Sequence, residues 1–193
     1  MSDLFFTSDL HLGHANSIRF TDRPYSCVDE MNEALIKNIN GVVGKNDELY
    51  ILGDVSFRTN KTTVIELLKE ITCRNLHLVV GNHDLDFLQD EVFKTVEIYQ
   101  EIRYADHELP LVLFHYPISD WNRKRHGAMH LHGHIHSVGP SYNEKNFAIG
   151  NYAFDVGVDA NSFKPVSIEE IIALKNKTKE NSEPNPEKEK EEN

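Results

Sequence analysis

Three short apolar segments in the first half of the chain constrain its fold more than any other feature of the sequence. They span Leu4–Thr7, Glu48–Leu52 and Leu76–Val80, and a polar or glycine-containing turn closes each of them. Between them, apolar residues recur at helical spacing: Val28, Met31, Leu35 and Ile39, then Val64, Leu67, Leu68 and Ile71. This alternation of strands and helices predicts parallel strands.

The second half of the chain has a different pattern. Apolar stretches that favour β-structure lie at Glu97–Ala105, Leu111–His115, Ala128–His132 and Phe147–Val158. Short polar turns join them, so we expect antiparallel hairpins in this half.

Two serines mark expected helix starts. Ser26 is expected to cap the first helix, which should end near Asn40-Gly41. Ser167 is expected to cap a last helix that carries Ile168, Ile171, Ile172 and Leu174.

Length and composition favour one domain of ordinary size. A chain of 193 residues with 39% hydrophobic content can bury one substantial core, and we place this domain at residues 1–175. Residues 176–193 contain no apolar side chain and are rich in Lys, Glu, Asn and Pro. We therefore expect a disordered, charged tail there.

Charge and composition exclude some classes of function. A net charge of −11 gives no global positive field, so bulk binding of nucleic acid is not expected. Cys27 and Cys73 lack metal-binding spacing and cannot build a disulfide framework for a domain of this size. With neither a signal sequence nor a long apolar run, the expectation is a cytoplasmic protein without a membrane partner.

Polar side chains that can bind metal ions follow five of the expected strands. They are Asp9 and His11, then Asp54, then Asn82 and His83, then His115, and last His134 and His136. Because ligand sites in α/β sheets form beyond the carboxyl ends of strands, these side chains can converge on one point. Residues two apart in an extended segment face the same side, which would let each such pair point inward.

Five blocks of the sequence, taken in chain order, resemble the signature motifs of calcineurin-like metallophosphoesterases. The blocks are Asp9-x-His11, Gly53-Asp54, Gly81-Asn82-His83-Asp84, His115 and Gly133-His134-x-His136. A Gly-Asp pair alone carries almost no information, whereas all five blocks in order form a specific signal. The resemblance implies an α/β (α+β) fold, a β-sandwich of two mixed sheets flanked by helices, with a dinuclear metal site at the sheet edge.

The resemblance also implies how the residues divide between two divalent ions. One ion would be bound by Asp9, His11, Asp54 and His136. The other would be bound by Asp54, Asn82, His115 and His134, so that Asp54 is the bridge. Two ions that share such a ligand can hold a hydroxide that attacks phosphorus in line. Because the set contains no thiolate, Mn, Fe, Zn, Co or Ni fits better than a soft metal. Mn is the first expectation among them.

Two further residues take catalytic roles by the same resemblance. His83 would protonate the leaving group as a general acid instead of binding metal. Arg58 stands at the offset from Asp54 where the protein phosphatases of this superfamily carry a phosphate-binding arginine, so it would clamp the phosphate. Phe57 replaces the carboxylate that orients the histidine in that branch.

Several other polar residues have both a functional and a structural interpretation. His14 and Asn16 either reach the substrate or cap the next segment. The basic stretch from Trp121 to His126 is either a wall that faces the substrate or a solvated loop. His77 and His107 lie outside the motif blocks, and we expect them to be hydrogen-bonded core residues or exposed ones.

The function expected from this set is hydrolysis of phosphate esters, with small or exposed phosphodiesters as the first expectation. A phosphomonoesterase and a nuclease are the alternatives among enzymes. A non-catalytic adaptor of the same fold is the alternative from another class. An adaptor would be expected to lack some ligands, whereas this chain carries all of them.

Overall fold

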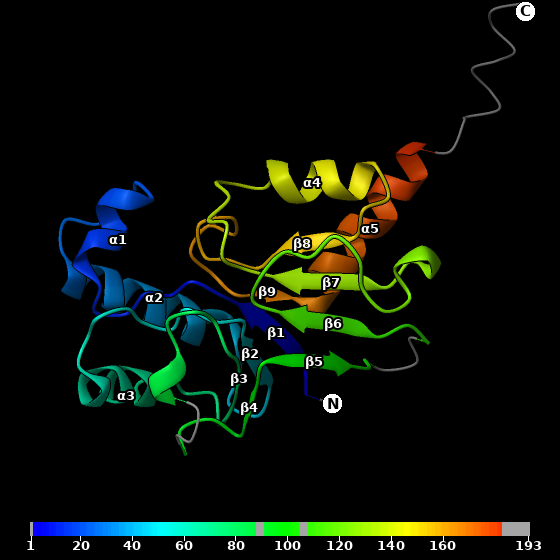
Figure 1. Ribbon diagram of the computed structural model, residues 1–193. Helices are drawn as coiled ribbons and strands as arrows, with labels where there is room; N and C mark the ends of the chain where they lie inside the picture. The colour runs from blue at the N-terminus through cyan, green and yellow to red at the C-terminus, as the bar shows by residue number, and fades with distance from the viewer. Residues whose placement is uncertain (1, 88–90, 105–107, 183–193) are drawn as a thin grey trace, which may run out of the picture.

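The computed structural model describes residues 2–87, 91–104 and 108–182, which form two mixed sheets flanked by helices (Figure 1). The first sheet has the strand order β4-β3-β2-β1-β9, and the second has the order β5-β6-β7-β8. This arrangement confirms the predicted fold class. Within the described residues, no helix is both long and apolar enough to cross a membrane.

The first sheet confirms the predicted parallel strands. Its strands are β1 (Leu4–Thr7), β2 (Glu48–Ile51), β3 (Asn75–Val79), β4 (Thr95–Glu97) and β9 (Val166–Ser167). The pairs β1–β2, β2–β3 and β3–β4 are parallel, and β9 pairs antiparallel with β1. Helices α1 (Ala15–Phe20), α2 (Val28–Val42) and α3 (Lys61–Lys69) lie on the connections between the first three strands.

The second sheet is only partly antiparallel, which corrects the prediction of hairpins. Its strands are β5 (Tyr99–Ile102), β6 (Leu111–Phe114), β7 (Met129–His132) and β8 (Ala153–Asp155). Only β5 and β6 pair antiparallel, whereas β6–β7 and β7–β8 are parallel. Helix α4 (Ser141–Ala148) makes the crossover from β7 to β8. Phe147 therefore belongs to α4, and the strand expected at Phe147–Val158 shrinks to β8.

Two large apolar cores and one small one hold the layers together, and alternate residues of β2 divide between the two large cores. In β2, Leu49 and Ile51 face the core under α2 and α3, while Tyr50 faces the core between the sheets. Leu113 of β6 and Leu131 of β7 meet that second core from the other sheet. Successive side chains of a strand point to opposite faces of the sheet, so apolar residues at successive positions indicate a strand that is buried on both faces. The sandwich brings the carboxyl ends of strands from both sheets together.

The cap that was expected at Ser167 is present, whereas the cap expected at Ser26 and the helix end expected before residue 176 are not. Ser167 and Glu170 form the expected capping box at the start of α5 (Ile168–Ser182). Ser26 does not cap α2, because its hydroxyl bonds the Glu30 carboxylate and Cys27 occupies the N-cap position. Helix α5 continues to Ser182, so residues 176–182 are helical, contrary to the prediction of a disordered tail. Residues 183–193 lie outside the described part.

His77 is a core residue, as one of the two interpretations predicted. Its side chain is buried in β3, where Nε2 lies 2.6 Å from the Glu48 carboxylate and Nδ1 lies 2.7 Å from the Thr95 hydroxyl. His107 lies outside the described residues.

Candidate metal centre

The candidate ligands lie on the loops that follow β1, β2, β3, β6 and β7. Five of them have left-handed backbone geometry, with φ of 57° at Asp9, 51° at His11, 52° at Asp54, 73° at His134 and 47° at His136. Residues other than glycine seldom adopt a positive φ, and backbone strain of this kind concentrates at functional sites. Sharp turns, and not the expected extended geometry, therefore aim these side chains inward.

One cluster of metal-binding side chains consists of Asp9, His11 and His136. One ligand atom from each of these residues lies within 4.8 Å of the other two. His136 Nε2 is 3.3 Å from His11 Nε2 and 3.8 Å from Asp9 Oδ1. The backbone N–H of His134 donates to the Asp9 carboxylate at 3.0 Å, which ties the loop after β7 to the loop after β1.

A second cluster consists of Asp54, His115 and His134, with one ligand atom of each again within 4.8 Å of the others. His115 Nε2 lies 3.5 Å from Asp54 Oδ1 and 3.1 Å from Asn82 Oδ1, so Asn82 borders this cluster. Asp54 also faces the first cluster, since its Oδ2 is 3.8 Å from His11 Nε2. Asp54 thus belongs to the second cluster through Oδ1 and turns Oδ2 toward the first cluster.

At His136, burial is outweighed by the hydrogen bond to Asp159 and the charges of Asp9 and Asp159, which raise the pKa. At three other side chains of the clusters, burial dominates. It raises the pKa of Asp9 to about 7, lowers the pKa of His11 to about 2 and lowers the pKa of His115. Each of these three shifts disfavours the charged form, because solvation of a charge is poor here. A bound cation would offset that cost for the carboxylates and bind the neutral imidazoles. Imidazole, carboxylate and amide donors without a thiolate fit divalent ions from Mn to Zn.

His83 lies beside the two clusters. Its backbone N–H donates to Asp54 Oδ1 at 3.2 Å, its Nε2 is 3.9 Å from Asp54 Oδ2, and 30% of its side chain is exposed. The ring of Phe57 packs against the imidazole with 4.1 Å between the ring centroids. An aromatic ring therefore contacts His83 where the protein phosphatases would supply a carboxylate.

Asp84 holds the loop backbone around the bridging residue. Its carboxylate accepts hydrogen bonds from the backbone N–H groups of Asp54 at 2.7 Å, Gly81 at 2.8 Å and Val55 at 2.9 Å. Burial raises the pKa of Asp84 to about 6, although these hydrogen bonds oppose that shift. Asp84 therefore fixes the loops after β2 and β3 relative to each other.

A cavity of about 430 Å³ opens onto both clusters. Its polar lining comes from His11, Asp54, Asn82, His83, His134 and His136. The remaining wall consists of Phe57 and of residues at or next to α1, namely His14, Ser17, Phe20 and Thr21. Phe20 is 77% exposed although it is a large apolar side chain. The cavity thus joins the candidate ligands to an aromatic wall.

Of the residues that were expected to face the substrate, one lines the cavity and two do not. His14 lines the cavity, whereas Asn16 is exposed on α1 and does not line it. Arg58 is exposed, and its guanidinium carbon lies 4.9 Å from the centroid of the Phe57 ring. Arg58 is therefore next to the aromatic wall but outside the cavity lining.

The basic stretch from Trp121 to His126 lies away from this cavity. Lys124 and Arg125 border a different hollow together with Tyr152, and Trp121 Nε1 donates to the backbone oxygen of Ala128 at 2.9 Å. The structure agrees with the interpretation of a solvated loop with a packed tryptophan.

Two functional neighbours were not found by sequence reasoning. Asp159 lies 2.7 Å from Nδ1 of His136, and the buried Arg23 pairs with Asp159. Arg23 and Asp159 are separated by 136 positions and belong to none of the motif blocks, so no local pattern marks them as partners.

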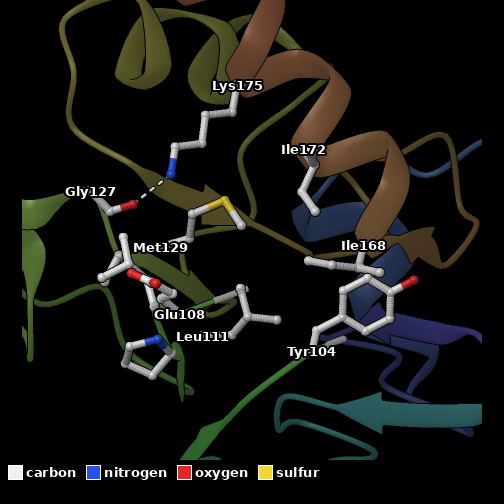
Figure 2. Close-up of a pocket in the computed structure, with 11 residues that line it drawn as sticks. Tyr104, Glu108, Leu111, Gly127, Met129, Ile168, Ile172 and Lys175 are labelled. Atoms are coloured by element: carbon white, nitrogen blue, oxygen red, sulfur yellow. Dashed lines mark hydrogen bonds between the residues drawn. The ribbon is translucent and has the colours of Figure 1, made fainter. Parts of the chain in front are cut away.

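A second cavity, of about 260 Å³, is lined by residues at or next to the starts of β6 and β7 (Figure 2). Candidate ligands follow the other ends of these strands. Leu111, Met129 and Ile168 give this second cavity an apolar lining. Lys175 of α5 donates to the backbone oxygen of Gly127 at its rim (Figure 2). This cavity is separate from the metal-binding clusters.

Comparison with known proteins agrees with the fold and the clusters. Residues 3–108 match the calcineurin-like phosphoesterase family, and the chain belongs to this family. This match includes the blocks up to His83, while His115, His134 and His136 lie beyond it. The family implies divalent metal ions.

Two relatives are similar to this chain over nearly their whole length. The chain is 34% identical over 183 residues to the uncharacterized protein MJ1445 of Methanocaldococcus jannaschii, covering 93% of this chain and 94% of that protein. It is 31% identical to the Gene 66 protein of Mycobacterium phage L5, covering 91% of this chain and 95% of that protein. Among solved structures, a protein of unknown function, AQ665 from Aquifex aeolicus, matches with a TM-score of 0.68 and 25% identity, over 90% of this chain and 100% of that chain.

Proposed function

We propose that this protein is a dinuclear-metal-dependent hydrolase of phosphate esters that acts on small or exposed phosphodiesters. The observation that carries this proposal is the pair of ligand clusters that flank Asp54 and open onto one cavity. When bound, two divalent ions supply a nucleophile at neutral pH and positive charge for the phosphate oxygens. Mn is the ion we propose first, on the basis of the oxygen and nitrogen donors.

In this proposal each cluster binds one ion. Asp9, His11 and His136 hold the first ion, and Asn82, His115 and His134 hold the second. Asp54 contributes to both. The neutral imidazole and amide donors leave net positive charge at the site, which favours an anionic phosphate and its transition state.

His83 is proposed as the proton donor to the leaving oxygen. It stands beside Asp54 at the cavity without belonging to either cluster, and part of its imidazole is exposed. A positioned acid within reach of the leaving group is what general acid catalysis requires. Phe57 holds the ring by packing, so the leaving group meets an apolar surface next to the acid.

The proposed preference for diesters rests on the cavity wall. A monoester dianion demands more positive charge than a diester monoanion, and phosphatases meet this demand with arginines. Lys124 and Arg125 border a different hollow, and Arg58 lies outside the cavity lining. The apolar rings of Phe20 and Phe57 instead give the second ester arm a surface to contact. We propose no membrane partner and no bulk nucleic-acid partner.

The test is to replace Phe20 by alanine and measure hydrolysis of a bis-aryl phosphate and the matching mono-aryl phosphate. Loss of about 80 Å² of aromatic contact, worth about 2 kcal/mol, should raise KM for the diester about 30-fold, with little change in kcat. Ile149→Ala is the matched control, because Ile149 is 78% exposed against 77% for Phe20 and lies away from the cavity. The proposal predicts a wild type with the higher kcat/KM on the diester. A wild type that prefers the monoester would contradict it.

A further inference from the structure

A buried ion pair lies directly behind one candidate ligand of the metal centre. Arg23 and Asp159 are 4% and 7% exposed. The guanidinium donates through Nε to Asp159 Oδ1 at 2.9 Å and through Nη2 to Asp159 Oδ2 at 3.0 Å. Such a two-point geometry fixes both side chains in orientation as well as in distance. Asp159 Oδ2 also lies 2.7 Å from Nδ1 of His136.

This arrangement determines which nitrogen of His136 carries the proton. An ionised carboxylate only accepts hydrogen bonds, so Nδ1 must be the donor toward Asp159. In the neutral imidazole, Nε2 then keeps its lone pair, and this is the atom that points toward His11 and Asp9. The tautomer that Asp159 selects is the one that can bind a metal ion through Nε2.

The same guanidinium holds the other half of the first cluster. Arg23 Nη2 donates to the backbone oxygen of Asp9 at 2.7 Å, and Nη1 donates to the backbone oxygen of Leu10 at 3.0 Å. These bonds support the left-handed turn that carries the first ligands. One buried arginine thus connects the loop after β1 with the loop that carries His136.

The second cluster is held in a different way. Nδ1 of His115 contacts the backbone oxygen of Leu52 at 2.8 Å, so a neutral carbonyl and not a charged pair orients that ring. Removing the charge of Asp159 should therefore affect one of the two clusters selectively.

We infer that Arg23 and Asp159 are a positioning pair that fixes the metal-binding tautomer of His136 and the adjacent Asp9 turn. This inference rests on the proposed metal centre. Neither residue needs to touch the substrate, because the pair acts through the side chain and the loop that it orients.

The test is Asp159→Asn in the full chain. An amide offers one acceptor oxygen in place of two, so it cannot accept from Arg23 Nε, Arg23 Nη2 and His136 Nδ1 together. If the amide NH₂ faces His136, it donates to Nδ1 and moves the imidazole proton to Nε2, which blocks metal binding. Titration with Mn²⁺ should show one class of site weakened about 10–100-fold while the other class is unchanged.

A second readout and two further variants separate positioning from a general structural role. The ¹⁵N shifts of the His136 ring should report the Nδ1–H form in the wild type and its loss in Asp159→Asn. Arg23→Lys keeps the positive charge but loses the two-point contact of the guanidinium with Asp159. It should give an intermediate loss of Mn²⁺ affinity. Glu48→Gln alters a second carboxylate–histidine pair, between half-buried Glu48 and buried His77, and should lower the melting temperature without changing Mn²⁺ affinity.

The outcomes distinguish this inference from the proposed function. A wild type that binds two Mn²⁺ ions, with unchanged affinities in Asp159→Asn, would overturn the inference and leave the metal centre intact. Equal weakening of both sites, or loss of affinity in Glu48→Gln, would also overturn it, since each indicates general damage. A wild type that binds no Mn²⁺ would overturn the proposed metal centre itself, and the inference with it.

Discussion

Among single residues, the side chains of the candidate metal centre depend on backbone conformations that most residues avoid. Asp9, His11, Asp54, His134 and His136 all have positive φ. Each such residue costs on the order of 1–3 kcal/mol, so the surrounding contacts must hold it in place. The hydrogen bonds from Arg23 and to Asp84 act on these turns.

Gly53 allows the loops after β2 and β3 to approach each other. Its φ is +88°, and an added Cβ would stand 2.7 Å from the Cα of Gly81 and against the ring of His115. We predict that Gly53→Ala lowers the free energy of unfolding by about 2–5 kcal/mol, from backbone strain and overpacking together. Urea unfolding monitored by circular dichroism measures this change.

Gly41→Ala is the matched control for that substitution. Gly41 lies within α2, and an added Cβ would meet no atom within 4 Å. Because alanine favours the helix over glycine, this variant should gain up to about 1 kcal/mol. Equal effects of the two substitutions would mean that the tight approach at Gly53 does not contribute to stability.

At the scale of elements, the sequence predicted the first sheet better than the second. Helical spacing between β1, β2 and β3 leaves little choice but right-handed parallel crossovers. In the second half, a short apolar run such as Leu111–His115 has no preferred strand direction, and the connections decide it. Phe147 contributes to the core from α4 and not from a strand, which its hydrophobicity alone does not reveal.

The end of α5 also differs from what the composition predicted. Residues 176–182 lack apolar side chains, and composition alone indicated disorder. Lysine and glutamate are good helix formers, however, and a helix already started at Ile168 can extend through them without a new nucleus. Local propensity thus outweighed the lack of apolar surface.

Strand β7 carries a buried histidine that should make the protein sensitive to acid. His130 has no exposed surface, and its Nδ1 lies 3.1 Å from the backbone oxygen of Val112. Burial lowers the pKa of His130 from 6.5 to about 4. The folded chain therefore binds this proton only near pH 4, whereas the unfolded chain binds it below about pH 6.5.

The stability contributed by neutral His130 is thus complete above pH 6.5 and is lost as the pH falls toward 4. Between pH 7 and pH 4, the free energy of unfolding of the wild type should fall more than that of His130→Gln, by up to about 3 kcal/mol. His126→Gln, which removes an exposed histidine, should keep the wild-type slope. Identical slopes for wild type and His130→Gln would contradict this prediction.

At the scale of the whole molecule, the sandwich brings the carboxyl ends of strands from both sheets to one cavity. The residues that the fold gathers into the two clusters could be predicted from the sequence, because their chemistry and their positions after strands are visible locally. The pairing of Arg23 with Asp159 could not, because only the tertiary fold brings together residues 136 positions apart. The aromatic wall of Phe20 and Phe57 also depends on where α1 packs.

The central claim is that two ions, joined through Asp54, are needed for activity. The most direct measurement counts the Mn²⁺ ions bound per chain while following hydrolysis of a bis-aryl phosphate during metal titration. Activity should saturate only when two ions are bound, and Asp54→Asn should lose both ions whereas His11→Ala should retain one. Full activity of the wild type with one bound ion, or with none, would contradict a dinuclear site.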